Sequence, residues 1–271
     1  MVQVYVWAKK DTYSVEDLVG IMQLLRGENG CPWDKEQTHL SIRNNLLEEA
    51  YETADAIDRL DDTDMAEELG DLLLQIVFHC QMAKERGSYD LDKVADGICK
   101  KLIYRHPHIF SNVVANTSDE VLNNWDKLKN KEKHMQSYSD TLKAVPKAFP
   151  ACLRAQKVQK RAAKAGYDFK SVQDTVLKIE EELSELKQAL FENDISAASS
   201  ELGDLLFSVV NAARFLKADA EQCLANTTER FISRFEKAEQ LAAKQNKDLA
   251  NLSEEELDLL WQEAKDSLTS F

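Results

Sequence analysis

Glycine and proline are scarce in this chain, with 8 Gly and 4 Pro among 271 residues. Because both residues interrupt helices, their scarcity and the abundance of Glu, Leu, Ala and Lys predict an almost entirely helical protein. Apolar runs that approach the roughly 18 residues of a membrane span are also missing, so we expect no membrane partner. Residues 1–7 are too short for the apolar core of a signal peptide.

Positive charge is scarce as well, because 34 Lys and Arg face 48 Asp and Glu, for a net charge of −14. This balance argues against general nucleic-acid binding, which favours a basic surface. It leaves room for a nucleotide bound through a metal ion. The five cysteines are scattered and never in C-x-x-C spacing, which predicts a reduced, cytoplasmic protein. P-loop, G-x-S-x-G and EF-hand motifs are absent from the sequence.

What the chain does contain is one acidic pattern, present twice. Four acids match one for one at an offset of 133 positions: Glu49 with Glu182, Glu52 with Glu185, Glu68 with Glu201, and Asp71 with Asp204. A fixed period of this size indicates two tandem copies of one domain rather than a short-repeat solenoid. We expect an N-terminal domain over residues 1–135 and a C-terminal domain over residues 136–271.

The spacing of the acids predicts a cluster in each copy. Acids three positions apart share one face of a helix, and a polar turn separates the two pairs, at Asp61–Thr63 in the first copy and Phe191–Asp194 in the second. Antiparallel helices joined there would place both pairs at one level, roughly 12 Å from the turn. Four carboxylates facing one point repel each other unless a cation lies among them. Their hard oxygens select Mg²⁺ or Mn²⁺, and Mg²⁺ leaves room for substrate phosphates.

The alternative is a solvated acidic face, the usual reason for glutamate runs on helices. The duplication argues against it, because both copies keep the acids while neighbouring residues differ. Asp71 and Asp204 each precede an apolar run, where a carboxylate needs a partner or a metal. Gly70 and Gly203 stand one residue earlier, where glycine costs about 1 kcal/mol relative to alanine. We therefore expect close approach of a helix or ligand there, and favour a metal site.

A di-iron site is disfavoured by the distribution of histidine. Such a bundle needs Glu-x-x-His on two helices, and only Glu36 and His39 have this spacing, while the second half contains no histidine.

Two cation-bearing pairs in the second half allow two interpretations each. Arg230 and Arg234 are four apart on one helix face, which suits either a solvated stripe or neutralisation of a triphosphate. Trp261 and Lys265 are also four apart. The tryptophan suits either core packing or base stacking, with the lysine on a phosphate.

The elements expected from periodicity and capping signals are helices throughout, giving an all-α fold of two tandem bundles. They cover about residues 14–26, 41–59, 64–86, 91–105, 118–131, 151–165, 172–191, 195–217 and 220–245, followed by a last helix opened by the Ser253–Glu256 capping box. Residues 27–35 and 112–118 are expected to be irregular, and 130–150 to form a linker.

The motif E-E-x-x-E followed by E-x-x-D resembles the MazG-type nucleoside triphosphate pyrophosphohydrolases. It occurs as Glu48–Glu52 with Glu68–Asp71 and as Glu181–Glu185 with Glu201–Asp204. Two further segments, Gly30–Asp34 and Arg105–Phe110, are similar to the tandem two-domain members, so the resemblance covers nearly the whole chain. It implies two MazG-like bundles related to the all-α dUTPases, Mg²⁺ dependence and a homodimer. The implied activity is hydrolysis of NTPs or dNTPs to the monophosphate and pyrophosphate.

The resemblance also implies roles for single residues. The metal ligands would be Glu182, Glu185, Glu201 and Asp204, with Glu49, Glu52, Glu68 and Asp71 as their counterparts, and the nucleotide contacts would be Lys178, Glu181, Arg230, Arg234, Trp261 and Lys265. The cation would bind the triphosphate and lower the pKa of water, and Glu182 or Glu185 would accept the proton.

We expect the second copy to be the main catalyst, because it alone is followed by the terminal helix with Trp261 and Lys265. The first copy would be catalytic, regulatory or a dimerisation module. Two other functions remain open at this point: a non-catalytic, metal-stabilised helical dimer acting as an interaction module, and a narrower activity on modified or deoxynucleotides.

Overall fold

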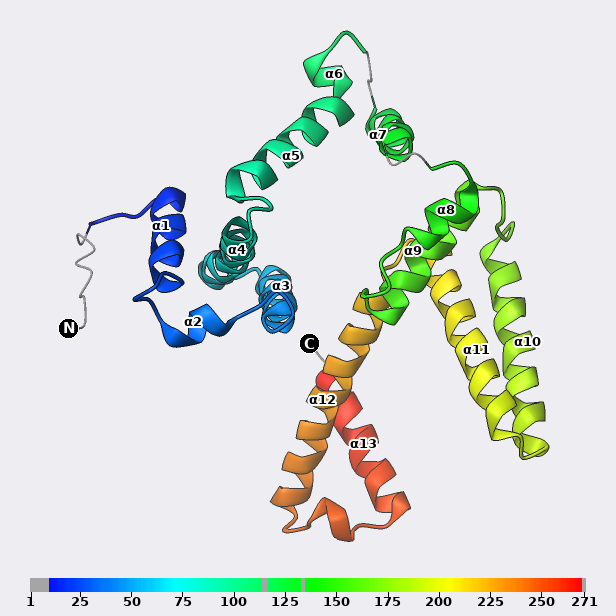
Figure 1. Ribbon diagram of the computed structural model, residues 1–271. Coiled ribbons are helices and arrows are strands. Elements are labelled where there is room, and N and C mark those ends of the chain that lie inside the picture. The colour runs from blue at the N-terminus through cyan, green and yellow to red at the C-terminus, as the bar shows by residue number, and fades with distance from the viewer. Residues whose placement is uncertain (1–9, 114–116, 133–134, 270–271) are drawn as a thin grey trace. The chain divides into compact units, whose positions relative to one another are not determined.

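The computed structural model describes residues 10–113, 117–132 and 135–269, and within them it contains helices and no strand (Figure 1). The all-α prediction is therefore confirmed. The chain divides into two compact units, residues 1–129 and 130–271. The domain boundary after residue 135 stays a prediction. Expectations for residues 1–7, and for parts of the stretches 112–118 and 130–150, fall outside the described residues. No described helix combines the length and the apolar character needed to cross a membrane.

The first unit is built around an antiparallel helical hairpin. Its helices are α1 (Val15–Leu25), α2 (Pro32–Glu36), α3 (Arg43–Asp58), α4 (Asp62–Glu85), α5 (Leu91–Arg105) and α6 (Pro107–Phe110), and α7 (Ser118–Glu132) runs across the division between the two units. Helices α3 and α4 form the hairpin, and α1 packs against α4. The core of the unit comprises Met22, Ile42, Val77, Phe78 and Met82. It therefore lies where α1 and the start of α3 meet the C-terminal half of α4.

The second unit contains two helical hairpins. Its helices are α8 (Tyr138–Lys143), α9 (Ala151–Lys164), α10 (Val172–Phe191), α11 (Ile195–Phe215), α12 (Ala220–Lys244) and α13 (Glu254–Thr269), with a 3₁₀ turn at Leu249–Asn251. Helices α10 and α11 form one hairpin and α12 and α13 the other, while α9 packs against α11 (Figure 1). Ala238, Ala242, Leu260 and Ala264 form the core between α12 and α13.

The turns of the two acid-bearing hairpins are closed in the same way. A residue with positive φ ends the first helix of each, Leu60 (φ 55°) in the first unit and Asn193 (φ 56°) in the second. The following aspartate caps the next helix: Asp61 accepts from the backbone of residues 63 and 64, and Asp194 accepts from residue 197. The first turn was expected at Asp61–Thr63, but it lies slightly earlier because the Asp61 cap places Asp62 and Thr63 inside α4.

Two short helices lie where loops were expected. Helix α8 begins with a capping box in which Asp140 N donates to Ser137 Oγ. A linker was expected here because charged residues and two prolines lie nearby. Helix α2 begins at Pro32, since proline is favourable in the first helical turn.

The expected close approach of another helix at Gly70 and Gly203 is wrong for the described structure. A Cβ added at either glycine would have open space around it.

Candidate active site

Three acids of the second unit converge between α10 and α11. Glu182 projects from α10, whereas Glu201 and Asp204 project from α11, and each offers an oxygen within 4.8 Å of the others. Glu182 is only 6% exposed, while Asp204 faces solvent. Glu185, one turn after Glu182, is close enough to Glu201 to raise the pKa of the Glu201 carboxyl. The structure thus brings together all four acids that the sequence paired.

The electrostatics of this cluster are repulsive. Partial loss of solvent raises the pKa of Glu201, and the charges of Glu185, Asp204 and Glu182 raise it further. A carboxyl group shifts in this direction when like charges surround it. The cluster therefore favours either protonation or a bound cation.

Lys178 lies at the edge of this cluster on α10. Its ammonium is 2.8 Å from Glu181 Oε1 and 2.8 Å from Glu182 Oε1. Hydrogen bonds to these two carboxylates raise the pKa of Lys178, so the side chain stays charged. One cation here faces several carboxylates, which leaves the cluster net negative.

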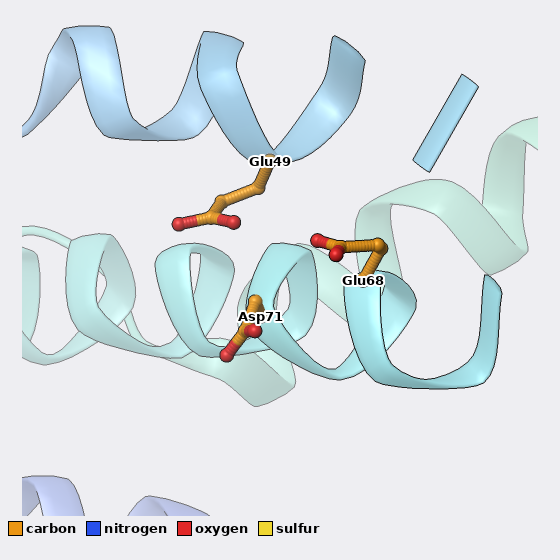
Figure 2. A group of neighbouring side chains, drawn as sticks. All are labelled: Glu49, Glu68 and Asp71. Carbon is orange, nitrogen blue, oxygen red and sulfur yellow. The ribbon is translucent and has the colours of Figure 1, made fainter. Parts of the chain in front are cut away.

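The first unit repeats the acidic arrangement. Figure 2 shows Glu49 reaching from α3 towards α4, which carries Glu68 and Asp71, and the three carboxylates lie within 4.8 Å of one another. Loss of solvent, followed by the charges of Asp71 and Glu52, raises the pKa of Glu49. The pKa of Glu68 is raised by loss of solvent and then by Glu52.

The two units differ at the position of Lys178. The offset of 133 places Asn45 there in the first unit. The ammonium beside the second cluster thus has a neutral amide as its counterpart.

Both clusters fit a hard divalent cation. Their donors are carboxylate oxygens only, which suit Mg²⁺, Mn²⁺ or Ca²⁺ and not a soft metal. The raised pKa values of Glu49, Glu68 and Glu201 show that their ionised forms are destabilised by neighbouring carboxylates and loss of solvent. A bound cation would stabilise these ionised forms.

The expected nucleotide contacts on α12 and α13 belong to a different hairpin from the acids. Arg230 is exposed and donates to Thr227 Oγ1 at 2.7 Å, and Arg234 is half-buried on the same helix. The Trp261 ring lies 5.1 Å from the Phe231 ring, so the tryptophan packs within this hairpin. Lys265 is half-buried one turn further along α13. The nucleotide roles of these four residues stay predictions.

A cavity of about 600 Å³ adjoins the second acid cluster, and Lys178, Glu182 and Asp204 line it. Sequence reasoning missed three further lining residues, Gln159, Ser208 and Asn211, which are polar and buried. The available signal was weak: Ser208 and Asn211 interrupt an otherwise apolar stretch of α11.

The model of the MazG nucleotide pyrophosphohydrolase domain matches residues 37–110 and again residues 170–238. Each segment contains one complete set of four acids.

Relatives resemble the chain over most of its length. It is 41% identical over 256 residues to a nucleoside triphosphate pyrophosphohydrolase of Escherichia coli K12, covering 93% of this chain and 97% of the relative. A nucleoside triphosphate pyrophosphohydrolase/pyrophosphatase MazG of Thermotoga maritima is 42% identical over 250 residues, covering 92% and 95%. The uncharacterised protein YabN of Bacillus subtilis is 43% identical over 251 residues, covering 91% of this chain and 50% of YabN. This chain therefore belongs to the MazG nucleotide pyrophosphohydrolase family and carries two copies of the family's domain.

Proposed function

We propose that this chain hydrolyses nucleoside triphosphates, ribo- or deoxyribo-, to the monophosphate and pyrophosphate. The observation that carries the proposal is the group of Glu182, Glu201 and Asp204, whose carboxylates gather within 4.8 Å in a member of this family. The relatives from E. coli and T. maritima, named for this activity, support it.

The proposed cofactor is Mg²⁺, with Mn²⁺ as a substitute. Glu182, Glu185, Glu201 and Asp204 would hold it in the second unit, and Glu49, Glu52, Glu68 and Asp71 in the first. Such a cation neutralises phosphate charge and makes water more acidic.

The chain's own side chains supply positioning and proton transfer. The Lys178 ammonium has three N–H donors, and its contacts with Glu181 and Glu182 leave one to donate to a phosphate oxygen. Glu182 or Glu185 accepts the proton of the attacking water. Arg230 and Arg234 are the proposed partners of the departing pyrophosphate, whose charge a guanidinium stabilises.

The second unit is the proposed main catalyst. Its cluster has Lys178 and an adjoining cavity, whereas the first has Asn45 at the equivalent position. Trp261 and Lys265 are proposed as its further nucleotide contacts. The first unit would then bind a cation mainly for stability or regulation.

A homodimer is the proposed assembly. Large apolar side chains are exposed along the α10–α11 hairpin, namely Val176, Leu177, Leu183, Leu190, Leu202, Leu206, Phe207 and Val209. Exposed large apolar side chains in this number on one hairpin suit an interaction site. The proposed location is the cytoplasm, which suits the five free thiols.

Product analysis tests the proposed activity. Incubation with ATP and Mg²⁺ should give AMP and pyrophosphate, resolved by ³¹P NMR. Glu185→Ala should abolish turnover while the far-ultraviolet circular dichroism stays that of the wild type. Release of ADP and phosphate would overturn the proposal. So would an unchanged nucleotide with a metal-raised melting temperature, which the non-catalytic dimer predicts.

A further inference from the structure

We propose that His39, His79 and Arg86 form a proton-sensitive latch in the first unit. While both imidazole rings are neutral, the latch ties residues 37–42, which connect α2 to α3, to the C-terminal half of α4. Uptake of a proton by either ring opens the latch and releases this connection.

Two hydrogen bonds in series join the three side chains. Arg86 Nη2 lies 2.6 Å from His39 Nε2, and His39 Nδ1 lies 2.7 Å from His79 Nδ1. The two rings are parallel, with an interplanar angle of 0° and centroids 5.0 Å apart. Because each nitrogen lies in its own ring plane, the planes are at most 2.7 Å apart, whereas carbon atoms in contact are about 3.5–4.0 Å apart. The rings therefore lie side by side, as an in-plane N–H···N bond requires.

The direction of these hydrogen bonds fixes the protonation of both rings. A guanidinium only donates, so His39 Nε2 presents its lone pair to Arg86 and the His39 proton is on Nδ1. His39 Nδ1 then donates to His79 Nδ1, which leaves the His79 proton on Nε2. A second proton on His39 would face the guanidinium, and one on His79 Nδ1 would face the His39 N–H. The closed latch therefore accommodates only neutral rings.

The surroundings of the two rings also oppose protonation. Loss of solvent lowers the pKa of His39 below its usual 6.5, and the charges of Arg86 and Arg26 lower it further. Loss of solvent, followed by the charge of His39, lowers the pKa of His79. The charged groups that face the pair are thus Arg86 at the end of α4 and Arg26 at the end of α1, and Arg26 is itself paired with Glu85 at 2.8 Å.

The closed latch leaves one polar group unsatisfied. With its proton on Nε2, His79 has a buried N–H for which the described residues provide no acceptor. A buried donor without a partner is unfavourable, and opening would expose it to water. This term reduces the free energy that keeps the latch closed, so a smaller change in pH is enough to open it.

Opening of the latch affects the start of α3 most directly. Residues 37–42 are otherwise held by Ile42, which packs in the core, and by Arg26, which donates to the backbone oxygen of Gln37 at 3.3 Å. These contacts do not depend on the imidazoles. We therefore expect acid to loosen the first turn of α3 while the rest of the unit stays folded.

The second unit has no counterpart of the latch. The offset of 133 places apolar or acidic residues at the three latch positions, namely Val172, Ala212 and Asp219. Residues 136–271 contain no histidine at all. Helix α10, the counterpart of α3, therefore serves as an internal reference for the effect of pH.

The tautomers of the two rings test the hydrogen-bond direction in the full-length protein. Long-range ¹⁵N–¹H NMR spectra at neutral pH should show the proton on Nδ1 of His39 and on Nε2 of His79, with the signals assigned from His39→Gln and His79→Gln. Free histidine favours the Nε2 proton, so the Nδ1 proton of His39 is diagnostic. A proton on Nε2 of His39, or a charged His39 at neutral pH, would overturn the proposal.

Hydrogen exchange measures the opening. The Leu46 amide donates to the Ile42 oxygen in the first turn of α3. Its protection factor should fall at least about tenfold between roughly pH 7.5 and 5.5, because each proton that only the open form binds shifts the equilibrium by up to about tenfold per pH unit. Protection of the α10 amides should stay constant. An unchanged protection factor at Leu46, or an equal fall in α10, would contradict the latch.

Substitutions of Arg86 test its part in setting the pH of opening. Arg86→Leu removes both the donor and the charge, so the His39 proton should return mainly to Nε2 and the midpoint of opening should move to higher pH. Arg86→Lys keeps a charged donor and should restore the wild-type tautomer and midpoint. Lys84→Leu is the matched control, because Lys84 is an exposed cation in the last turn of α4 and is not among the charges that lower the pKa of His39. The same midpoint in Arg86→Leu as in the wild type, or an equal shift in Lys84→Leu, would refute the role of Arg86.

Discussion

Magnesium should reverse the stability effect of Glu201→Gln. In metal-free protein, the Glu201 carboxylate lies within 4.8 Å of those of Glu182 and Asp204, and the substitution removes one of these like charges. We therefore expect the variant to melt at or above the wild-type temperature in EDTA. With Mg²⁺ present the order should invert, because the variant has lost a charged metal ligand.

The size of the magnesium effect follows from linkage. A ligand that binds only the folded state adds about 2.7 kcal/mol at a concentration of one hundred times its Kd. For a second unit of about 140 residues, with an unfolding entropy of roughly 2.1 cal/mol/K per residue, the melting temperature should rise by about 9 °C. Glu201→Gln should lose most of this rise.

Differential scanning calorimetry at neutral pH measures the melting temperature in EDTA and its rise in saturating Mg²⁺. Glu180→Gln is the matched control, because Glu180 is an exposed glutamate on α10 outside the acid cluster. Its magnesium-dependent rise should equal that of the wild type. An undiminished rise in Glu201→Gln, or an equal loss in Glu180→Gln, would refute the assignment of the cation to these carboxylates.

Three further predictions concern stability and assembly. Arg26→Ala should destabilise the first unit by about 2–3 kcal/mol in urea denaturation, less than a fully buried pair because Glu85 is partly exposed. Since Arg26 lowers the pKa of Glu85 below its usual 4.5, this loss should be full above pH 4.5 and shrink as the pH falls through the folded-state pKa. Leu60→Gly should raise the melting temperature, with a gain of up to about 1 kcal/mol, because Leu60 is 88% exposed at φ 55°. Leu206→Glu should shift the protein from dimer to monomer in light scattering, since Leu206 is among the exposed apolar residues of α11; a dimer of unchanged mass would contradict the proposed interface.

The helical framework could be predicted because its signals are local. Aspartate or serine caps and the polar turns between apolar stretches set most helix ends within a few residues, as for α10 at Val172–Phe191. The capping box of α8 was equally local, but Pro146 and Pro150 nearby favoured a linker. Competing local signals of this kind are resolved only by packing, here of α8 against α9.

The acid clusters could be predicted because the sequence contains the same spacing of four acids twice. The cavity could not, since its lining combines Gln159 of α9 with Ser208 and Asn211 of α11. Which polar side chains become buried depends on how those helices pack, and the spacing of residues within one helix does not determine that. Trp261 illustrates the same limit: its packing against Phe231 was one of the two interpretations that the sequence left open.

The most direct test compares the turnover of two variants that carry equivalent substitutions, one in each unit. We predict that Asp204→Asn lowers the rate of pyrophosphate release from ATP at least about a hundredfold, as expected for loss of a group that contributes several kcal/mol to the transition state. Asp71→Asn, its counterpart on α4, should retain a rate within a few-fold of the wild type. Pyrophosphate release that survives Asp204→Asn but is lost in Asp71→Asn would contradict the claim that the α10–α11 carboxylates carry the reaction.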